Sequence, residues 1–126
     1  MIEDFTGAVD GGGYKNRMDD PSKLQPTLIP PQFIAGVAQV LQHGAKKYSR
    51  GNWMRGMSFS SILDAIQTHL LAIQRGEDLD LDSGLPHIYH VGCNLAFLSW
   101  YQEGPNSAEY AQFDDRHFTG SFHGQR

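Results

Sequence analysis

The stretch Arg75-Gly-Glu-Asp-Leu-Asp-Leu-Asp-Ser-Gly-Leu-Pro-His-Ile-Tyr-His90 carries four carboxylates and two histidines where one helical pattern ends and the next begins. The whole chain has 14 acidic and 10 basic residues, so its net charge of -4 matches the four carboxylates of this stretch. Two carboxylates held ~4 Å apart repel by about 4 kcal/mol at an effective dielectric of about 20. Because a cation removes that repulsion, the stretch indicates a divalent metal site.

Helical patterns flank this acidic loop on both sides. The first begins at Ser58 or Ser60, either of which can cap a helix, and ends at Gly76. The second begins near Pro86 and ends at Gly104-Pro105, a strong stop signal. Apolar residues recur along both segments at helical spacing: Ile62, Ile66, Leu70, Ile73, Ile88, Val91, Leu95 and Leu98. Two helices joined by so short a loop should pack antiparallel.

A further helix is predicted from Pro31 to Lys47, because Pro30-Pro31 suits a first helical turn and apolar residues follow at helical spacing. The chain of 126 residues is long enough for one hydrophobic core. Three helices of this size leave apolar surface uncovered. We therefore expect an all-α fold, a helical bundle completed by oligomerisation as a homodimer or homotetramer.

The two ends of the chain lack helical periodicity. Residues 1–27 contain Gly11-Gly-Gly13 and are expected to form an irregular N-terminal arm. Residues 28–104 form the predicted helical core of a single domain spanning 1–126, and residues 105–126 form an irregular C-terminal tail. Aromatic rings of that tail are expected to pack on a neighbouring subunit: Tyr110, Phe113, Phe118 and Phe122.

Three histidines are predicted to converge beside the acidic loop. With the turn centred near Asp80, His69 on the preceding helix lies level with the first two turns of the following one. It therefore comes close to His87 and His90, which lie on one polar stripe with Asn94. Carboxylates suit magnesium or manganese, and imidazole shifts the preference toward manganese, cobalt and other transition metals.

The loop also resembles two other kinds of segment, a calcium-binding hand and a solvated surface loop. Asp78-x-Asp80-x-Asp82 imitates the start of a calcium-binding EF-hand, but Ser83 and Tyr89 stand where the hand requires Gly and Glu. A calcium hand is therefore rejected. An exposed, solvated acidic loop, with histidines that only fill the core or the surface, stays open as the alternative.

A second candidate region lies between Gly44 and Gly56, where four of the ten basic residues stand beside an aromatic ring and an amide. Positive charge suits phosphates, Trp53 could stack on a base, and Asn52 could bind base edges. Alternatively, the basic residues favour a helix dipole and Trp53 fills the core. Together with the metal site, the region predicts a polyphosphate ligand between the two.

Composition excludes several classes of protein. The apolar runs are too short to span a bilayer, and the first residues lack the pattern of a signal peptide, so we expect a cytoplasmic protein without membrane contact. The acidic balance argues against a nucleic acid polymer as partner. The single cysteine, Cys93, is expected to be a small buried residue.

Short motifs follow one another along the chain: Lys46-Lys-Tyr48, Asn52-Trp-x-Arg-Gly56, His69-Leu70, Gly76-Glu-Asp-x-Asp80, Ser83-Gly-Leu85, His87-x-x-His90 and Asn94. Their order and spacing resemble a phage family of MazG-like dATP/dGTP diphosphohydrolases. Within it, the likeness is greatest to the MazZ-type branch of phages that replace adenine with 2-aminoadenine in their DNA. The resemblance covers roughly residues 13 to 103.

This resemblance implies an all-α fold related to the MazG nucleotide pyrophosphohydrolases, which work as oligomers. It also implies hydrolysis of a purine deoxynucleoside triphosphate, dGTP and possibly dATP, between the α and β phosphates to the monophosphate and pyrophosphate. In the MazZ-type branch the dGMP produced feeds the synthesis of 2-aminoadenine nucleotides. Two other classes stay open: a regulatory helical protein that binds nucleotide or metal without chemistry, and a phage structural or assembly protein.

The mechanism we expect is metal-assisted hydrolysis of the phosphoanhydride, with two or more divalent ions, Mn²⁺, Mg²⁺ or Co²⁺. The usual Glu-Glu-x-x-Glu and Glu-x-x-Asp motifs of MazG are absent. We expect the metal ligands to be Glu77, Asp78, Asp82, His87, His90 and His69. We assign the catalytic work to Glu77, Asp78, Asp82 and His87. Substrate binding is assigned to Lys47, Asn52, Trp53, Arg55 and Asn94.

Overall fold

The computed structural model describes residues 22–116 of the chain. The chain divides into two compact units, residues 1–30 and 31–126, and each is described by itself. In the first unit, Pro26–Leu28 form the short 3-10 helix η1, and Leu28 is exposed. Most of the predicted N-terminal arm lies outside the described residues.

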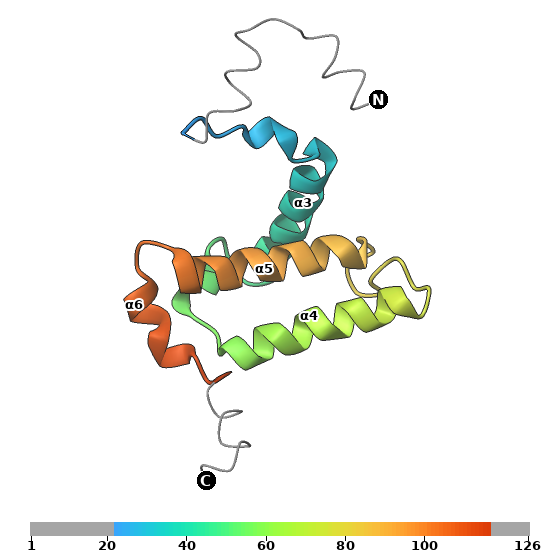
Figure 1. The fold of residues 1–126 in the computed structure, drawn as a ribbon. Coiled ribbons are helices and arrows are strands. Elements are labelled where there is room, and N and C mark those ends of the chain that lie inside the picture. The colour runs from blue at the N-terminus through green and yellow to red at the C-terminus, as the bar shows by residue number, and fades with distance from the viewer. Residues whose placement is uncertain (1–21, 117–126) are drawn as a thin grey trace, which may run out of the picture. The chain divides into compact units, whose positions relative to one another are not determined.

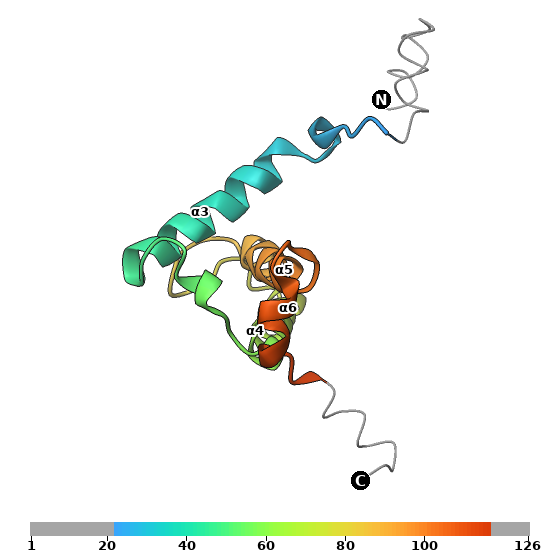
Figure 2. The same cartoon turned by 90° about the vertical axis from the view of Figure 1, so that its left-hand side faces the viewer.

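The second unit is built from helices in its described part, residues 31–116 (Figures 1 and 2). The α-helices are α3 (Pro31–Lys47), α4 (Phe59–Gln74), α5 (His87–Glu103) and α6 (Ser107–Tyr110). Two 3-10 helices accompany them, η2 (Asn52–Arg55) and η3 (Ala111–Phe113). The prediction of an all-α fold is confirmed for residues 22–116, within which no strand forms. None of these helices is long and apolar enough to cross a membrane.

The ends of the three long helices follow local sequence signals. Helix α3 begins and ends at the predicted residues. Ser58 caps α4, since its side-chain oxygen accepts a hydrogen bond from the Ser61 amide at 3.3 Å. Pro86 precedes the first turn of α5, and Gly104 follows the last one.

Helices α4 and α5 run side by side in opposite directions, as predicted, and α3 lies against α5 (Figures 1 and 2). Two glycines permit the close approach of α3 to α5. A Cβ atom on Gly36 would come within 2.4 Å of the Tyr89 ring, and one on Gly92 within 2.7 Å of Phe33. The α3–α5 contact therefore requires backbone without side chains at these positions.

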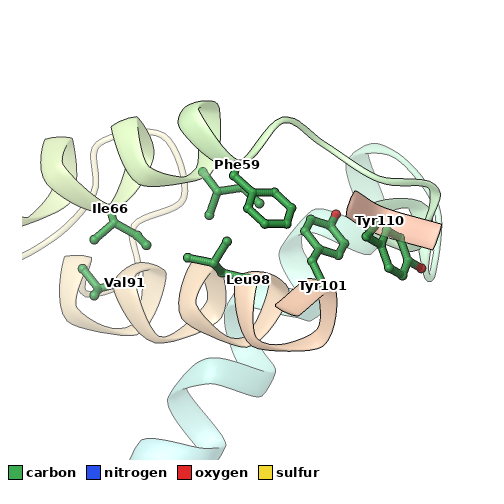
Figure 3. Close-up of a cluster of buried hydrophobic side chains, with 7 residues drawn as sticks. Phe59, Ile66, Val91, Leu98, Tyr101 and Tyr110 are labelled. Atoms are coloured by element: carbon green, nitrogen blue, oxygen red, sulfur yellow. The ribbon is translucent and has the colours of Figure 1, made fainter. Parts of the chain in front are cut away.

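The core lies between α4 and α5 (Figure 3). Its buried residues are Phe59, Ile62, Ile66, Val91, Leu98, Tyr101 and Tyr110. The predicted apolar stripes are wrong at Leu70, Ile88 and Leu95, which are 41%, 48% and 50% exposed. Helix α5 is covered by α4 and α3 together, so its buried face is set by both partners and not by one stripe. Cys93 is buried, as predicted.

The prediction of an irregular tail is wrong for residues 107–113, which form α6 and η3. Tyr110 is 9% exposed, and its ring stacks on Tyr101 with centroids 4.6 Å apart. This ring therefore packs on the chain's own core and not, as expected, on a neighbouring subunit. The remaining tail rings, Phe118 and Phe122, lie outside the described residues.

Candidate functional site

The acidic loop between α4 and α5 has a defined turn. Leu79 and Pro86 form an isolated antiparallel bridge, the Asp80 amide donates to the Leu85 carbonyl at 2.8 Å, and the His87 amide donates to the Asp78 carbonyl at 2.8 Å. Gly84 reverses the chain with a φ of 73°, in the left-handed region. The turn directs the acids differently: the Asp80 side chain is 20% exposed and that of Asp82 is 72% exposed.

The three histidines expected to converge beside this loop do so. His69 of α4 and His87 of α5 approach with their Nδ1 atoms 2.8 Å apart. The His90 ring lies parallel to the His69 ring, with centroids 4.6 Å apart and an interplanar angle of 11°. The histidine group connects the C-terminal half of α4 to the first turn of α5, because the short loop between the two helices brings these segments side by side.

Glu77 orients the His87 ring and favours one of its two neutral tautomers. Its Oε2 atom lies 2.7 Å from His87 Nε2, and His87 is 4% exposed. A carboxylate accepts, so neutral His87 carries its proton on Nε2 and donates it to Glu77. The bare Nδ1 of His87 then accepts from His69 across the 2.8 Å contact. The lone pair of His87 thus faces the centre of the histidine group.

Asp80 completes the group on the loop side. The Ser83 amide donates to Asp80 Oδ2 at 2.9 Å, and the Ser83 hydroxyl lies 2.7 Å from His90 Nε2. Burial alone would raise the pKa of Asp80, but the hydrogen bonds from Ser83 and the nearby histidines lower it below its usual value. Burial lowers the pKa values of His69 and His90. The geometry therefore favours an ionised carboxylate beside neutral imidazoles.

These protonation states suit a metal ion. One donor atom each from His69, Asp80 and His87 lie within 4.8 Å of one another, so the three residues could hold an ion. Metal binding requires neutral imidazole and ionised carboxylate. Glu77 contacts His87 from behind, as a carboxylate behind a metal-binding histidine does. The expected ligand Asp78 is exposed and lies outside this set.

A cleft of about 400 Å³ opens between α3, η2 and α5, next to the histidine group. His90 belongs to both features, since it stacks on His69 and lines the cleft. The residues assigned to substrate binding that line the cleft are Lys47, Asn52, Trp53 and Asn94. Arg55 is not among the lining residues of this cleft in the described part of the chain.

The rim of the cleft carries a weak ion pair. Lys47 Nζ lies 3.3 Å from Asp82 Oδ2, and both side chains are substantially exposed. The hydrogen bond from Lys47 to Asp82 raises the pKa of the lysine. An exposed ion pair contributes little to stability, so Lys47 can exchange Asp82 for another anion.

His43 is a lining residue that the sequence did not single out. Its Nε2 atom lies 3.7 Å from Asp82 Oδ2, shielded from solvent and without a hydrogen-bond partner among the described residues. The missed signal was the spacing of four residues to Lys47, which brings both side chains to one helical face. Asp80 and Ser83 are not among the residues that the sequence predicts for the site, because only the folded turn directs them inward.

Trp53 packs against the core and also lines the cleft. Its ring stacks on Phe97 with centroids 4.8 Å apart, and both rings line the cleft. Asn94 donates from its side-chain amide to the His90 carbonyl at 2.9 Å, and it also lines the cleft. The wall of the cleft on this side is therefore aromatic with an amide beside it.

The chain is thus a helical protein in which a candidate metal centre, made of histidines and a carboxylate, lies next to a ligand cleft. The cleft is lined by cationic and aromatic side chains. The chain belongs to the dATP/dGTP diphosphohydrolase family, whose N-terminal domain model matches residues 14–124. The resemblance noted from the motifs is thereby confirmed at the level of this family.

One relative illustrates the match. The dATP/dGTP diphosphohydrolase of Salmonella phage PMBT28 is 34% identical over 107 residues, covering 85% of this chain and 35% of that protein. The chain thus spans about a third of the length of this relative. No solved structure matches the chain.

Proposed function

We propose that this chain hydrolyses dATP and dGTP between the α and β phosphates, giving the deoxynucleoside monophosphate and pyrophosphate with the help of divalent metal ions. The proposal is carried by one observation: His90 links the candidate metal group to the cleft, since it stacks on His69 and lines the cavity. A triphosphate in the cleft would therefore lie beside the metal group. The family membership and the name of the phage relative, a dATP/dGTP diphosphohydrolase, support the substrate class.

The donor set fits a divalent ion. His69, Asp80 and His87 would hold it. Glu77 would accept a hydrogen bond from His87 Nε2, so that the unprotonated Nδ1 atom of His87 faces the ion. When bound, such ions offset charge on the phosphates and lower the pKa of an attacking water. Mixed imidazole and carboxylate ligands favour manganese or cobalt over magnesium.

The cleft residues would bind and orient the nucleotide. Lys47 would release the exposed carboxylate of Asp82 and bind phosphate, which carries more charge. Once the ligand displaces Asp82, a phosphate oxygen would give the Nε2 atom of His43 the hydrogen-bond partner that it lacks among the described residues. Trp53 and Asn52, which also line the cleft, would contact the purine base.

Asp82 and His90 are kept in the proposal as ligands on the cleft side. Both line the cavity, so they would contact an ion that arrives with the triphosphate. Asp78 is kept as a candidate, although the observations favour Asp80 over it. Arg55 would reach the leaving pyrophosphate only from outside the cleft lining.

Catalysis through a covalent nucleophile is not part of the proposal. Cys93 is the one thiol of the chain, and burial raises its pKa to about 11. A protonated, buried thiol is a poor nucleophile. Attack by water, oriented by the acidic residues, is therefore the step proposed.

Two further elements extend the proposal. Exposed apolar side chains on α4 and α5, Leu70, Leu71, Ile88 and Leu95, support a homodimer or homotetramer that covers them. The resemblance to the MazZ-type branch supports a role in which dGMP feeds 2-aminoadenine nucleotide synthesis in a phage.

Product analysis tests the proposal. The purified chain is incubated with dATP or dGTP and manganese, with and without a chelator, and the mono-, di- and triphosphates are resolved. Formation of monophosphate and pyrophosphate only with metal is expected. Release of single phosphates would contradict the cleavage position, and saturable binding without products would favour the regulatory alternative.

A further inference from the structure

The 3-10 helix η2 carries two cleft residues but has little means of holding its own shape. Gly51 and Gly56 bound it with φ angles of 76° and 107°, in the left-handed region. A 3-10 turn of four residues has poor hydrogen-bond geometry and does not persist alone. The position of Asn52 and Trp53 must therefore be fixed by contacts from elsewhere in the chain.

Two tyrosine hydroxyls provide such contacts. Tyr101 of α5 donates to the Trp53 carbonyl at 2.5 Å, and Tyr110 of α6 donates to the Met54 carbonyl at 2.7 Å. The tyrosines are 1% and 9% exposed, so water does not compete for these bonds. Burial raises the pKa of Tyr101 to about 12, which keeps its hydroxyl a donor at working pH.

Aromatic packing reinforces the same connection. Phe113 lies directly on Gly56, where a Cβ atom would come 2.2 Å from its ring. Tyr110 stacks on Tyr101, and the Tyr101 ring lies 6.3 Å from that of Trp53. Figure 3 shows Tyr101 and Tyr110 together at one end of the core. A continuous series of rings thus joins the C-terminal segment to the wall of the cleft.

The tyrosine contacts lie far from the candidate metal group. Tyr101 stands 14 residues after His87 on the same helix, which corresponds to about 21 Å along the axis at about 1.5 Å per residue. A change in the hydroxyls should therefore alter η2 without altering the ligands of the ion.

We propose that Tyr101 and Tyr110 are positioning residues for nucleotide binding, because their hydroxyls hold η2 in the conformation that presents Asn52 and Trp53 to the cleft. This inference rests on the proposed function and assigns the C-terminal segment, residues 107–113, a part in it. The two tyrosines act through η2 and do not touch the nucleotide.

Hydroxyl deletions test the inference in the full chain. Tyr101→Phe, Tyr110→Phe and the double variant keep the rings and remove the donors. Tyr89→Phe is the matched control, since its ring packs on Phe33 and Gly36 of α3, away from η2. Hydrogen exchange of the Met54 and Gly56 amides, which donate within η2, reports its opening without any ligand.

Exchange of those amides should rise by roughly fivefold in each single variant and remain unchanged in the control. The double variant should show a KM for dATP and dGTP raised roughly threefold to tenfold, with kcat and the half-activating manganese concentration within twofold of the unmodified chain. Restoring either tyrosine in the double variant should remove part of the increase in KM.

Several results would overturn the inference. Exchange equal to that of Tyr89→Phe would exclude a holding role for the hydroxyls. An unchanged KM, or a fall in kcat together with a raised manganese requirement, would exclude a specific effect on nucleotide binding. If the unmodified chain neither binds nor hydrolyses dATP or dGTP, the proposed function fails, and the exchange measurement still decides whether the tyrosines hold η2.

Discussion

Replacing Glu77 by glutamine should weaken metal binding without removing a metal ligand. The carboxylate of Glu77 accepts from His87 Nε2 at 2.7 Å and so leaves Nδ1 bare toward His69. A glutamine can instead donate to Nε2, which moves the proton to Nδ1 and into the place of the metal. The substitution preserves size and shape, so the change acts mainly on protonation and ring orientation.

The size of the expected loss in metal affinity follows from the contact of Glu77 with the metal ligand His87, on the side of the ring away from the ion. Loss of such a partner typically weakens metal affinity by about 10-fold to 100-fold, or about 1.4 to 2.7 kcal/mol. At a manganese concentration about 100 times the dissociation constant, the unmodified chain gains about 2.7 kcal/mol of stability. The variant should gain only about 0.4 to 1.4 kcal/mol under the same conditions.

Thermal unfolding followed during a manganese titration measures this difference without relying on turnover. Glu103→Gln is the matched control: it makes the same change of charge at an exposed position at the opposite end of α5. Manganese stabilisation of Glu77→Gln equal to that of the control would refute the orienting role. Complete loss of stabilisation at every concentration would refute it too, because it would identify Glu77 as a direct ligand.

Further substitutions probe the loop, the aromatic contact and the thiol. Asp80→Ala should abolish manganese stabilisation in the absence of nucleotide, whereas Asp82→Ala should keep that stabilisation and lose most of its pyrophosphate release; the reverse pattern would contradict the assignment of the two acids. Gly56→Ala should lower the free energy of unfolding by about 1 to 3 kcal/mol in urea, because its Cβ would meet the Phe113 ring at a φ of 107°. Cys93, with a pKa of about 11, should react slowly with a thiol reagent at pH 8, where about one molecule in a thousand carries the thiolate, and the rate should rise roughly tenfold per pH unit between pH 7 and 9. A rate independent of pH would contradict this.

The long helices could be predicted because their boundaries depend on local chemistry. Pro31 fixes a first turn, Ser58 caps α4 with its own side chain, and Gly104 ends α5. The convergence of His69 with His87 followed from the short connection between two antiparallel helices. Each of these features involves neighbouring residues or a single turn.

The direction of the acidic side chains could not be predicted in the same way. An extended Asp78-x-Asp80-x-Asp82 segment would turn all three acids to one side. The bridge between Leu79 and Pro86 and the left-handed Gly84 instead turn Asp80 inward, where its side chain is 20% exposed, and leave Asp82 at the rim beside Lys47. That outcome depends on pairing across the loop, which periodicity does not encode.

The packing of the C-terminal rings also depends on contacts distant in sequence. Tyr110 has no helical pattern around it, and its burial arises from the Tyr101 ring and the Met54 carbonyl. The exposed Leu70 and Ile88 show the same limit, because an apolar stripe predicts a buried face but not which partner covers it.

His69, Asp80 and His87 are proposed to form the metal centre beside the nucleotide cleft. Crystals of the chain soaked in manganese, with diffraction recorded at the manganese absorption edge, test this assignment. An anomalous peak is expected within bonding distance of all three residues, and it should be retained in Asp82→Ala and lost in Asp80→Ala. A peak bound only to Asp78 and Asp82 on the exposed side of the loop would contradict it.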